Sequence, residues 1–146
     1  IDKYQGKIIQ VGNANTVFNL PSIIDTSTSA IAGADDPNST NRVGINYKFV
    51  ITTSLTSSNT FVLNAGTAAG RSTADVFRGC AYYNNTATDP GAVTAFNAGG
   101  TDTLTLDATT RGGLEGTVVE CQAVDGLIWQ ITALLVGNGT FVTPWS

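Results

Sequence analysis

The 146-residue chain contains no histidine, and this absence removes the side chain that most often moves protons in catalysis near neutral pH. Charged residues make up only 12 % of the chain, about half of the ~25 % that is typical of soluble domains. The net charge is −4 and no lysines or arginines cluster, so the chain lacks the basic face that nucleic acid requires. No apolar run approaches the roughly 18 residues of a membrane span. We therefore expect neither nucleic acid nor a membrane as a partner.

The titratable residues that remain form no catalytic pattern. The carboxylates are scattered and no pair is placed to converge on one cleft, as a glycosidase would need. Cys80 and Cys121 have no histidine partner, and buried free thiols are favoured over a disulfide between them. Asp35, Asp36 and Asn38 could hold calcium, but the EF-hand spacing is missing and a solvated loop is the simpler interpretation. We predict no enzyme activity, no cofactor and no metal site.

The apolar residues that are present alternate with a period of two. In "GINYKFVITT", Tyr47, Phe49 and Ile51 share one face, and in "DTLTLD" the two leucines share another. No segment carries a sustained helical period with caps at both ends. The pattern predicts strands within residues 7–11, 15–20, 44–53, 60–64, 75–83, 92–96 and 102–107, and a hairpin over 116–137. The predicted fold class is all-β, a single antiparallel β-sandwich or barrel-like domain.

Residues 21–42, "PSIIDTSTSAIAGADDPNSTNR", interrupt this alternation with Ser, Thr, Asp, Gly and Pro. Such a composition predicts a long surface loop rather than a strand. We divide the chain into residues 1–15, an N-terminal arm or first strand that could form an interface, and residues 16–146, the β domain.

The predicted hairpin contains Trp129, and its register can be inferred from burial. A two-residue turn would set apolar residues of one strand against polar residues of the other. A three-residue loop over 124–126 instead places Trp129 opposite Cys121 and Ile131 opposite Val119, all apolar. We predict this second register, with a bulge at the glycine of the loop, and we expect Trp129 to anchor the core rather than to bind a ligand.

A sheet with few charges has edges that are poorly guarded against other chains. The segments "KIIQV" and "GTFVTPWS" are the best candidates for covering contacts, so we predict interface residues at Ile8, Ile9, Val11, Phe141 and Trp145. Trp145 lies one residue from the end, where a chain tends to fray. A tryptophan there docks either on its own domain or on a neighbouring subunit.

The order of these segments resembles the head decoration, or capsid cement, proteins of tailed bacteriophages. The resemblance begins with "NLPSI" and "GINYKFVITTSLTSSNTFVLNAG" and ends with "DVFRGCAYYN" and "DTLTLDATTRGGLEGTVVECQAVDGLIWQITALLVG". In the closing motif Gly116, Val118 or Val119, Trp129 and Gly137 take the places of the family's Gly, Val, Trp and Gly. The resemblance implies a structural virion protein, usually a homotrimer, that binds the major capsid protein on the outer capsid surface and stabilises the shell.

Two other readings of the sequence stay open. A receptor- or glycan-binding domain of a phage tail or head fibre would use exposed aromatic residues, for which Tyr82, Tyr83, Phe96 and Trp145 are available. A secreted adhesin or pilin-like subunit would have an edge strand completed by its partner.

Overall fold

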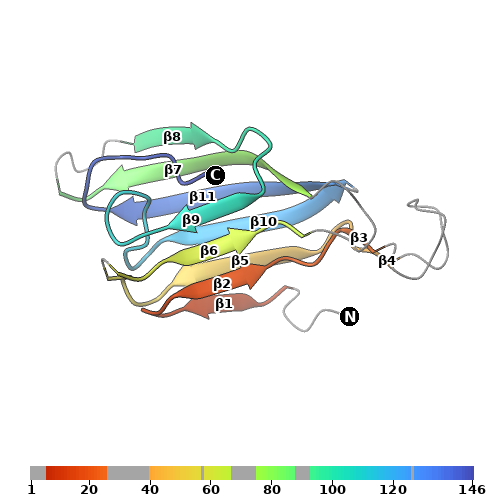
Figure 1. The fold of residues 1–146 in the computed structure, drawn as a ribbon, viewed down its shortest axis with the longest axis horizontal. Helices are drawn as coiled ribbons and strands as arrows, with labels where there is room; N and C mark the ends of the chain where they lie inside the picture. The colour runs from red at the N-terminus through yellow and green to blue at the C-terminus, as the bar shows by residue number, and fades with distance from the viewer. Residues whose placement is uncertain (1–5, 26–39, 57, 67–74, 88–92, 126) are drawn as a thin grey trace.

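The computed structural model describes residues 6–25, 40–56, 58–66, 75–87, 93–125 and 127–146. Within these residues there are eleven strands and no helix, and the strands form two larger sheets and one short two-stranded ribbon (Figure 1). The prediction of an all-β fold is confirmed. The two larger sheets form a sandwich and do not close into a barrel.

The larger sheet has six strands in the order β1-β5-β10-β11-β7-β8. Their bounds are β1 Ile8–Val11, β5 Asn46–Ile51, β10 Val118–Asp125, β11 Ile128–Gly137, β7 Val76–Asn85 and β8 Val93–Asn97. The smaller sheet has the order β2-β6-β9, with β2 Thr16–Asn19, β6 Phe61–Asn64 and β9 Thr103–Leu106. Each predicted strand segment overlaps one of these strands, the predicted hairpin holds β10 and β11, and β7 and β8 extend past the predicted ends at residues 83 and 96.

A short ribbon lies at the two ends of the predicted surface loop. β3, Ile24–Asp25, pairs antiparallel with β4, Thr40–Asn41. The long excursion therefore has a paired neck within residues 21–42, which the sequence analysis had treated as irregular throughout. Asp35, Asp36 and Asn38, the calcium alternative, lie outside the described residues.

The sheets are mixed rather than purely antiparallel, which corrects the sequence-based expectation. β1 pairs parallel with β5, β2 pairs parallel with β6, and β11 pairs parallel with β7. Alternation of apolar and polar residues reports which face a side chain takes, but it is the same for a strand read in either direction. The pattern therefore predicted the strands and their faces and was wrong about three of their pairings.

Two corners of the chain lie beside each other and link the sheets. The chain passes from β1 to β2 through residues 12–15 and from β5 to β6 through residues 52–60, each time changing sheet. The Asn13 side chain accepts hydrogen bonds from the Thr56 amide at 3.0 Å and from Asn59 Nδ2 at 2.9 Å. Asn15 accepts from the Thr60 amide at 2.9 Å. Side-chain carbonyls of the first corner thus hold the backbone of the second.

The β10–β11 hairpin has the predicted faces but a different register. Ala123 lies opposite Trp129 and Cys121 opposite Ile131, a slip of two residues from the predicted pairing. Asp125 pairs with Ile128, and the register shifts between Ala123 and Asp125. Burial selects between even and odd slips only, because a slip of two residues returns every side chain to the same face. The predicted glycine bulge at Gly126 falls outside the described residues.

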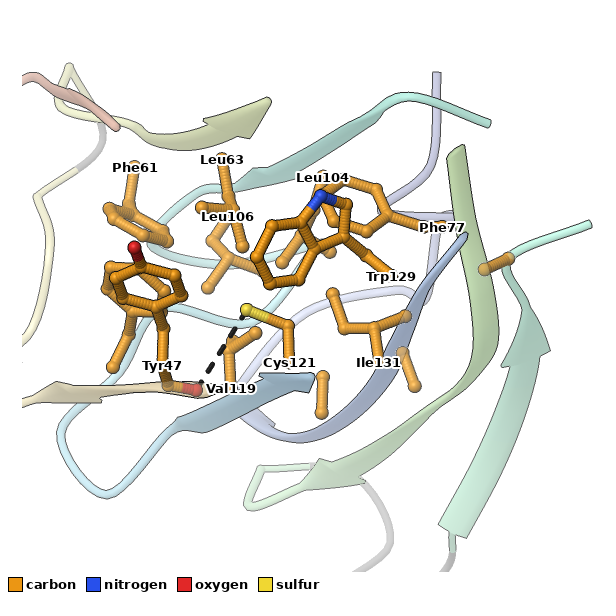
Figure 2. Close-up of a cluster of buried hydrophobic side chains, with 14 of the residues drawn as sticks. Tyr47, Phe61, Leu63, Phe77, Leu104, Leu106, Val119, Cys121, Trp129 and Ile131 are labelled. Carbon is orange, nitrogen blue, oxygen red and sulfur yellow. Dashed lines mark hydrogen bonds between the residues drawn. The ribbon is translucent and has the colours of Figure 1, made fainter. Parts of the chain in front are cut away.

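The core lies between the two sheets and is formed by the inward residues of every long strand. Trp129 is fully buried, as expected of a core anchor, and its ring centroid is 5.8 Å from that of Tyr47. Figure 2 shows Leu104 and Leu106 of β9 facing this pair from the smaller sheet. Tyr47, Phe49 and Ile51 are all buried along β5, so the predicted alternation holds there.

The C-terminal segment pairs with β9, the edge strand of the smaller sheet, and so widens that sheet. Trp145 forms a bridge with Leu104, and the Ser146 amide donates to the Thr103 carbonyl at 3.1 Å. The Trp145 indole donates to the Phe96 carbonyl at 3.2 Å, and its ring lies 6.3 Å from that of Phe77. This tryptophan is docked on its own domain. It packs against β7 and β8 of the larger sheet, beside the three strands of the smaller sheet.

Candidate interaction surfaces

An apolar row crosses the outer face of the larger sheet. In register from β5 to β8 the row contains Val50, Val118, Leu134, Tyr82 and Ala95. Leu134 is 55 % exposed and Tyr82 43 % exposed. Side chains of this size usually point inward in a sandwich strand. Covering this row with another protein would therefore remove apolar surface from water, which is favourable.

Polar residues flank the apolar row on one side, and few of them are charged. On the same outer face, two residues along each strand from the apolar row, lies a row of Lys48, Glu120, Thr132 and Cys80. Two residues further along lies a row of Asn46, Gln122, Gln130 and Arg78. Lys48 Nζ lies 2.6 Å from Glu120 Oε1, an exposed ion pair of the kind that adds little stability. The face is consequently close to neutral although the chain as a whole is acidic.

The polar rows surround a hollow of about 420 Å³. Its walls include the side of β1 at Ile8 and the amide side chains of Asn46, Gln122 and Gln130. These amides can donate and accept hydrogen bonds. Lys7, Lys48 and Glu120 also line the hollow, so charged groups lie beside the amides. The hollow suits a polar ligand or the polar side chains of another protein.

A second exposed apolar patch, the end cluster, lies at one end of the sandwich. It consists of Val43, Val124 and Leu127, which are 48 %, 46 % and 40 % exposed. The Gly44 amide donates to the Ala123 carbonyl at 2.7 Å, so the loop before β5 is tied to the end of β10. Turns normally present Gly, Asn, Asp, Ser or Pro to water. Three aliphatic side chains held there by backbone hydrogen bonds form a small, fixed contact surface.

The outer face of the smaller sheet is different, because its polar side chains bind one another. Asn64 Nδ2 donates to Asn19 Oδ1 at 2.8 Å, and the Thr103 hydroxyl donates to Asn64 Oδ1 at 3.2 Å. These three residues form a ladder across β2, β6 and β9. The ladder satisfies its own hydrogen bonds, and the row beside it contains Val17 and Val62 opposite Thr105, with Val17 62 % exposed.

The turn after β9 is organised by one carboxylate. Asp107 accepts hydrogen bonds from the amides of Thr109, Thr110 and Arg111 at 2.7 to 2.9 Å and from the Thr110 hydroxyl. Burial alone would raise the pKa of Asp107, but the hydrogen bonds outweigh it and hold the pKa below its usual value. The group is structural, since its oxygen atoms are engaged by its own turn.

The two cysteines are free thiols, as favoured from the sequence. Cys121 points into the core, where burial raises the pKa of its thiol to about 12, and the thiol donates a hydrogen bond to the Tyr47 carbonyl. Cys80 lies on the outer face of β7 and is half-buried. A thiol with so high a pKa is a poor nucleophile at neutral pH, so Cys121 belongs to the core.

The structure separates the five residues that the sequence pointed to as an interface. Val11 and Trp145 are buried in the chain's own core. Ile9 is half-buried, and Phe141 packs on Tyr83 with ring centroids 4.1 Å apart. Ile8 is 62 % exposed at the edge of the larger sheet.

The apolar row and the end cluster were missed by the sequence analysis. Alternation marked Leu134 and Val118 as outward residues, but which outward residues form one row depends on pairings that lie far apart in sequence. Val124 lies in the predicted loop and Leu127 follows it directly, and their apolar character was the signal available there.

Within the described ranges, no group of three or more cysteine, aspartate or glutamate residues is placed to hold a metal ion. The same part of the chain contains no helix long and apolar enough to cross a membrane. The chain matches no protein-family model, no curated protein and no solved structure.

Proposed function

We propose that the protein is a structural virion component, a capsid decoration or cement protein that binds the major capsid protein on the outer surface of a phage head. The class is drawn from the resemblance of the strand motifs. The observation that carries the proposal is the end cluster, a fixed apolar patch at the tip of a sandwich that has little charge. An end-on contact through this patch leaves both sheets outside the shell.

Such a protein stabilises a shell by mass action. It binds assembled subunits and not dissociated ones, so it raises the free energy needed to open the shell. Complete burial of an aliphatic side chain contributes about 2 kcal/mol. The three side chains of the end cluster are already about half-buried, so covering the rest contributes about 1 kcal/mol each. A contact of this strength is modest at one site, but it is repeated at every equivalent position of an icosahedral lattice.

The test is co-sedimentation with heads of the tailed phage that encodes the chain, stripped of accessory proteins. The chain should pellet with the heads and raise their melting temperature. A double variant, Val124→Asn with Leu127→Asn, should bind at least tenfold more weakly. Val142→Asn, at a residue 39 % exposed in the C-terminal segment, is the matched control and should bind as the parent does. Heads that gain neither chain nor stability would refute the proposal.

The hollow on the larger sheet favours one alternative, a glycan-binding domain of a phage fibre. Amide side chains in a concave site, with Lys7, Lys48 and Glu120 beside them, can donate to and accept from the hydroxyl groups of a sugar. In that case the chain would bind host envelope polysaccharide and ignore the heads. Gln122→Ala together with Gln130→Ala would then abolish that binding and leave the fold intact.

A further inference from the structure

The outer face of the larger sheet is the widest surface of the described residues that presents exposed apolar side chains. Leu134 and Tyr82 lie near its middle, and Ile8 and Val93 lie on its two edge strands, each more than 60 % exposed. We propose that this face binds the same face of a second copy of the chain, so that the protein is a two-fold symmetric dimer. This inference goes beyond the proposed function, because it concerns the free protein without a shell.

The register of the strands supports this particular occupant. A two-fold axis that runs parallel to the strands between β10 and β11 exchanges β10 with β11 and β5 with β7. Because that operation keeps each residue at its own level along the strands, it lays the apolar row on itself. Val118 then faces Leu134 of the second copy, and Val50 faces its Tyr82.

The charges on the face are compatible with the same axis. The charged residues on its described strands are Lys48, Glu120, Arg78 and Asp125, which pairs with Ile128 at the outward end of β10. Under the two-fold exchange, Lys48 faces Cys80, Glu120 faces Thr132 and Arg78 faces Asn46 of the second copy. No like charges oppose each other. The face carries two carboxylates and two basic side chains, so two acidic chains that meet here keep most of their negative charge apart.

The size of the face also suits a dimer. Six strands of four to ten residues, about 4.8 Å apart and with about 3.3 Å per residue, span roughly 600 Å² before the relief of the side chains is added. Stable interfaces bury about 800 Å² per partner. Sheets that pack face to face do so through rows of apolar side chains such as this one. A short peptide or a small ligand would leave most of the row uncovered.

The first measurement is the mass of the purified chain by light scattering between about 1 and 100 µM. We expect twice the 15.1 kDa of one chain. Leu134→Asn, at the centre of the row, should weaken the dimer at least tenfold. Leu127→Asn, a comparable change in the end cluster, should leave the mass unchanged. A monomer at every concentration, or a trimer as the family resemblance implies, would overturn the inference.

Cross-linking tests the axis itself. In a Cys80→Ser background, chains carrying Val118→Cys and chains carrying Leu134→Cys are purified separately and oxidised alone or mixed. The two positions face each other only between copies of different type, so the mixture should form a disulfide-linked dimer and neither variant should do so alone. Cross-linking within a single variant would place the axis elsewhere and refute the arrangement. Shell binding is not measured here, so failure of the dimer and failure of the decoration role are separate results.

Discussion

On the outer face of the smaller sheet, Asn64 donates to Asn19 and accepts from Thr103, whereas on the outer face of the larger sheet Leu134 and Tyr82 stand about half in water. Both faces belong to strands with the same alternation of inward and outward residues. On the smaller sheet one outward row is filled by polar groups that bind each other, and only Val17 and Val62 form an apolar pair beside it. On the larger sheet one apolar outward row crosses five strands.

The difference separates stability from recognition. A ladder of side-chain hydrogen bonds contributes to the folded chain by itself and gains nothing from a partner. An exposed apolar row contributes little to the free chain, but each side chain gains free energy when it is covered. The smaller sheet therefore completes the domain, and the larger sheet is the face with most to gain from association.

The largest expected effect contrasts the two faces of one strand. Trp129→Ala on the inner face of β11 should lower the free energy of unfolding by about 3–5 kcal/mol, because it empties the centre of the core. Gln130→Ala, the next residue and on the outer face, should change it by less than about 0.5 kcal/mol. Urea unfolding of both variants measures this. Similar losses in the two would mean that β11 does not have the faces described.

Alkaline pH contrasts the inward and outward thiols of the larger sheet. An unfolded thiol ionises near pH 8.5, whereas the pKa of Cys121 is about 12 in the fold. Above pH 8.5 the unfolded chain therefore binds fewer protons, and stability falls by about 1.4 kcal/mol per pH unit, or about 2 kcal/mol by pH 10. Urea unfolding at pH 7 and pH 10 should show this loss in the parent.

The matched variant is Cys121→Ala, which keeps Cys80 and every tyrosine. It should lose about 2 kcal/mol less than the parent over the same pH interval, since a thiol is no longer buried. An equal decline in the two proteins would show that Cys121 is not protonated in the fold at pH 10.

The ladder on the smaller sheet should give an intermediate effect. Asn64→Ala removes two hydrogen bonds and should cost about 1 kcal/mol, the usual net value for such contacts at a partly exposed site. Gln122→Ala removes an exposed amide from the larger sheet and should cost less than about 0.5 kcal/mol. If the two variants unfold alike, the ladder does not distinguish the two faces.

The smallest expected effect is the most informative about the apolar row. Leu134→Asn should change the stability of the monomer by less than about 0.5 kcal/mol when it is measured at low concentration, because the side chain is 55 % exposed. The same change should strongly affect self-association. A large loss of monomer stability would mean that Leu134 supports the fold and is not kept for a partner.

The positions and faces of the strands could be predicted from alternation alone. Tyr47, Phe49 and Ile51 were placed together on one face, which is the inner face of β5, and Trp129 was placed in the core. These predictions need only the two-residue period of a strand and the tendency of large apolar side chains to be buried. No knowledge of strand neighbours enters them.

What depends on neighbours could not be predicted. The hairpin register was wrong by two residues, because burial cannot distinguish slips that preserve the face. The parallel pairing of β7 with β11 was missed, because alternation has no direction. Leu134 and Tyr82 are adjacent only through that pairing, so the row that carries the further inference became visible with the topology.

The strand order has a consequence for how the chain folds. β10 and β11 lie at the centre of the larger sheet but are synthesised last among its strands, after both flanking pairs, β1 with β5 and β7 with β8. The two flanks share no neighbour until the final hairpin is inserted between them. Contacts so distant along the chain slow folding. We expect the larger sheet to stay open until β11 has been synthesised, and a chain that ends before Val118 to lack the two strands that join its flanks.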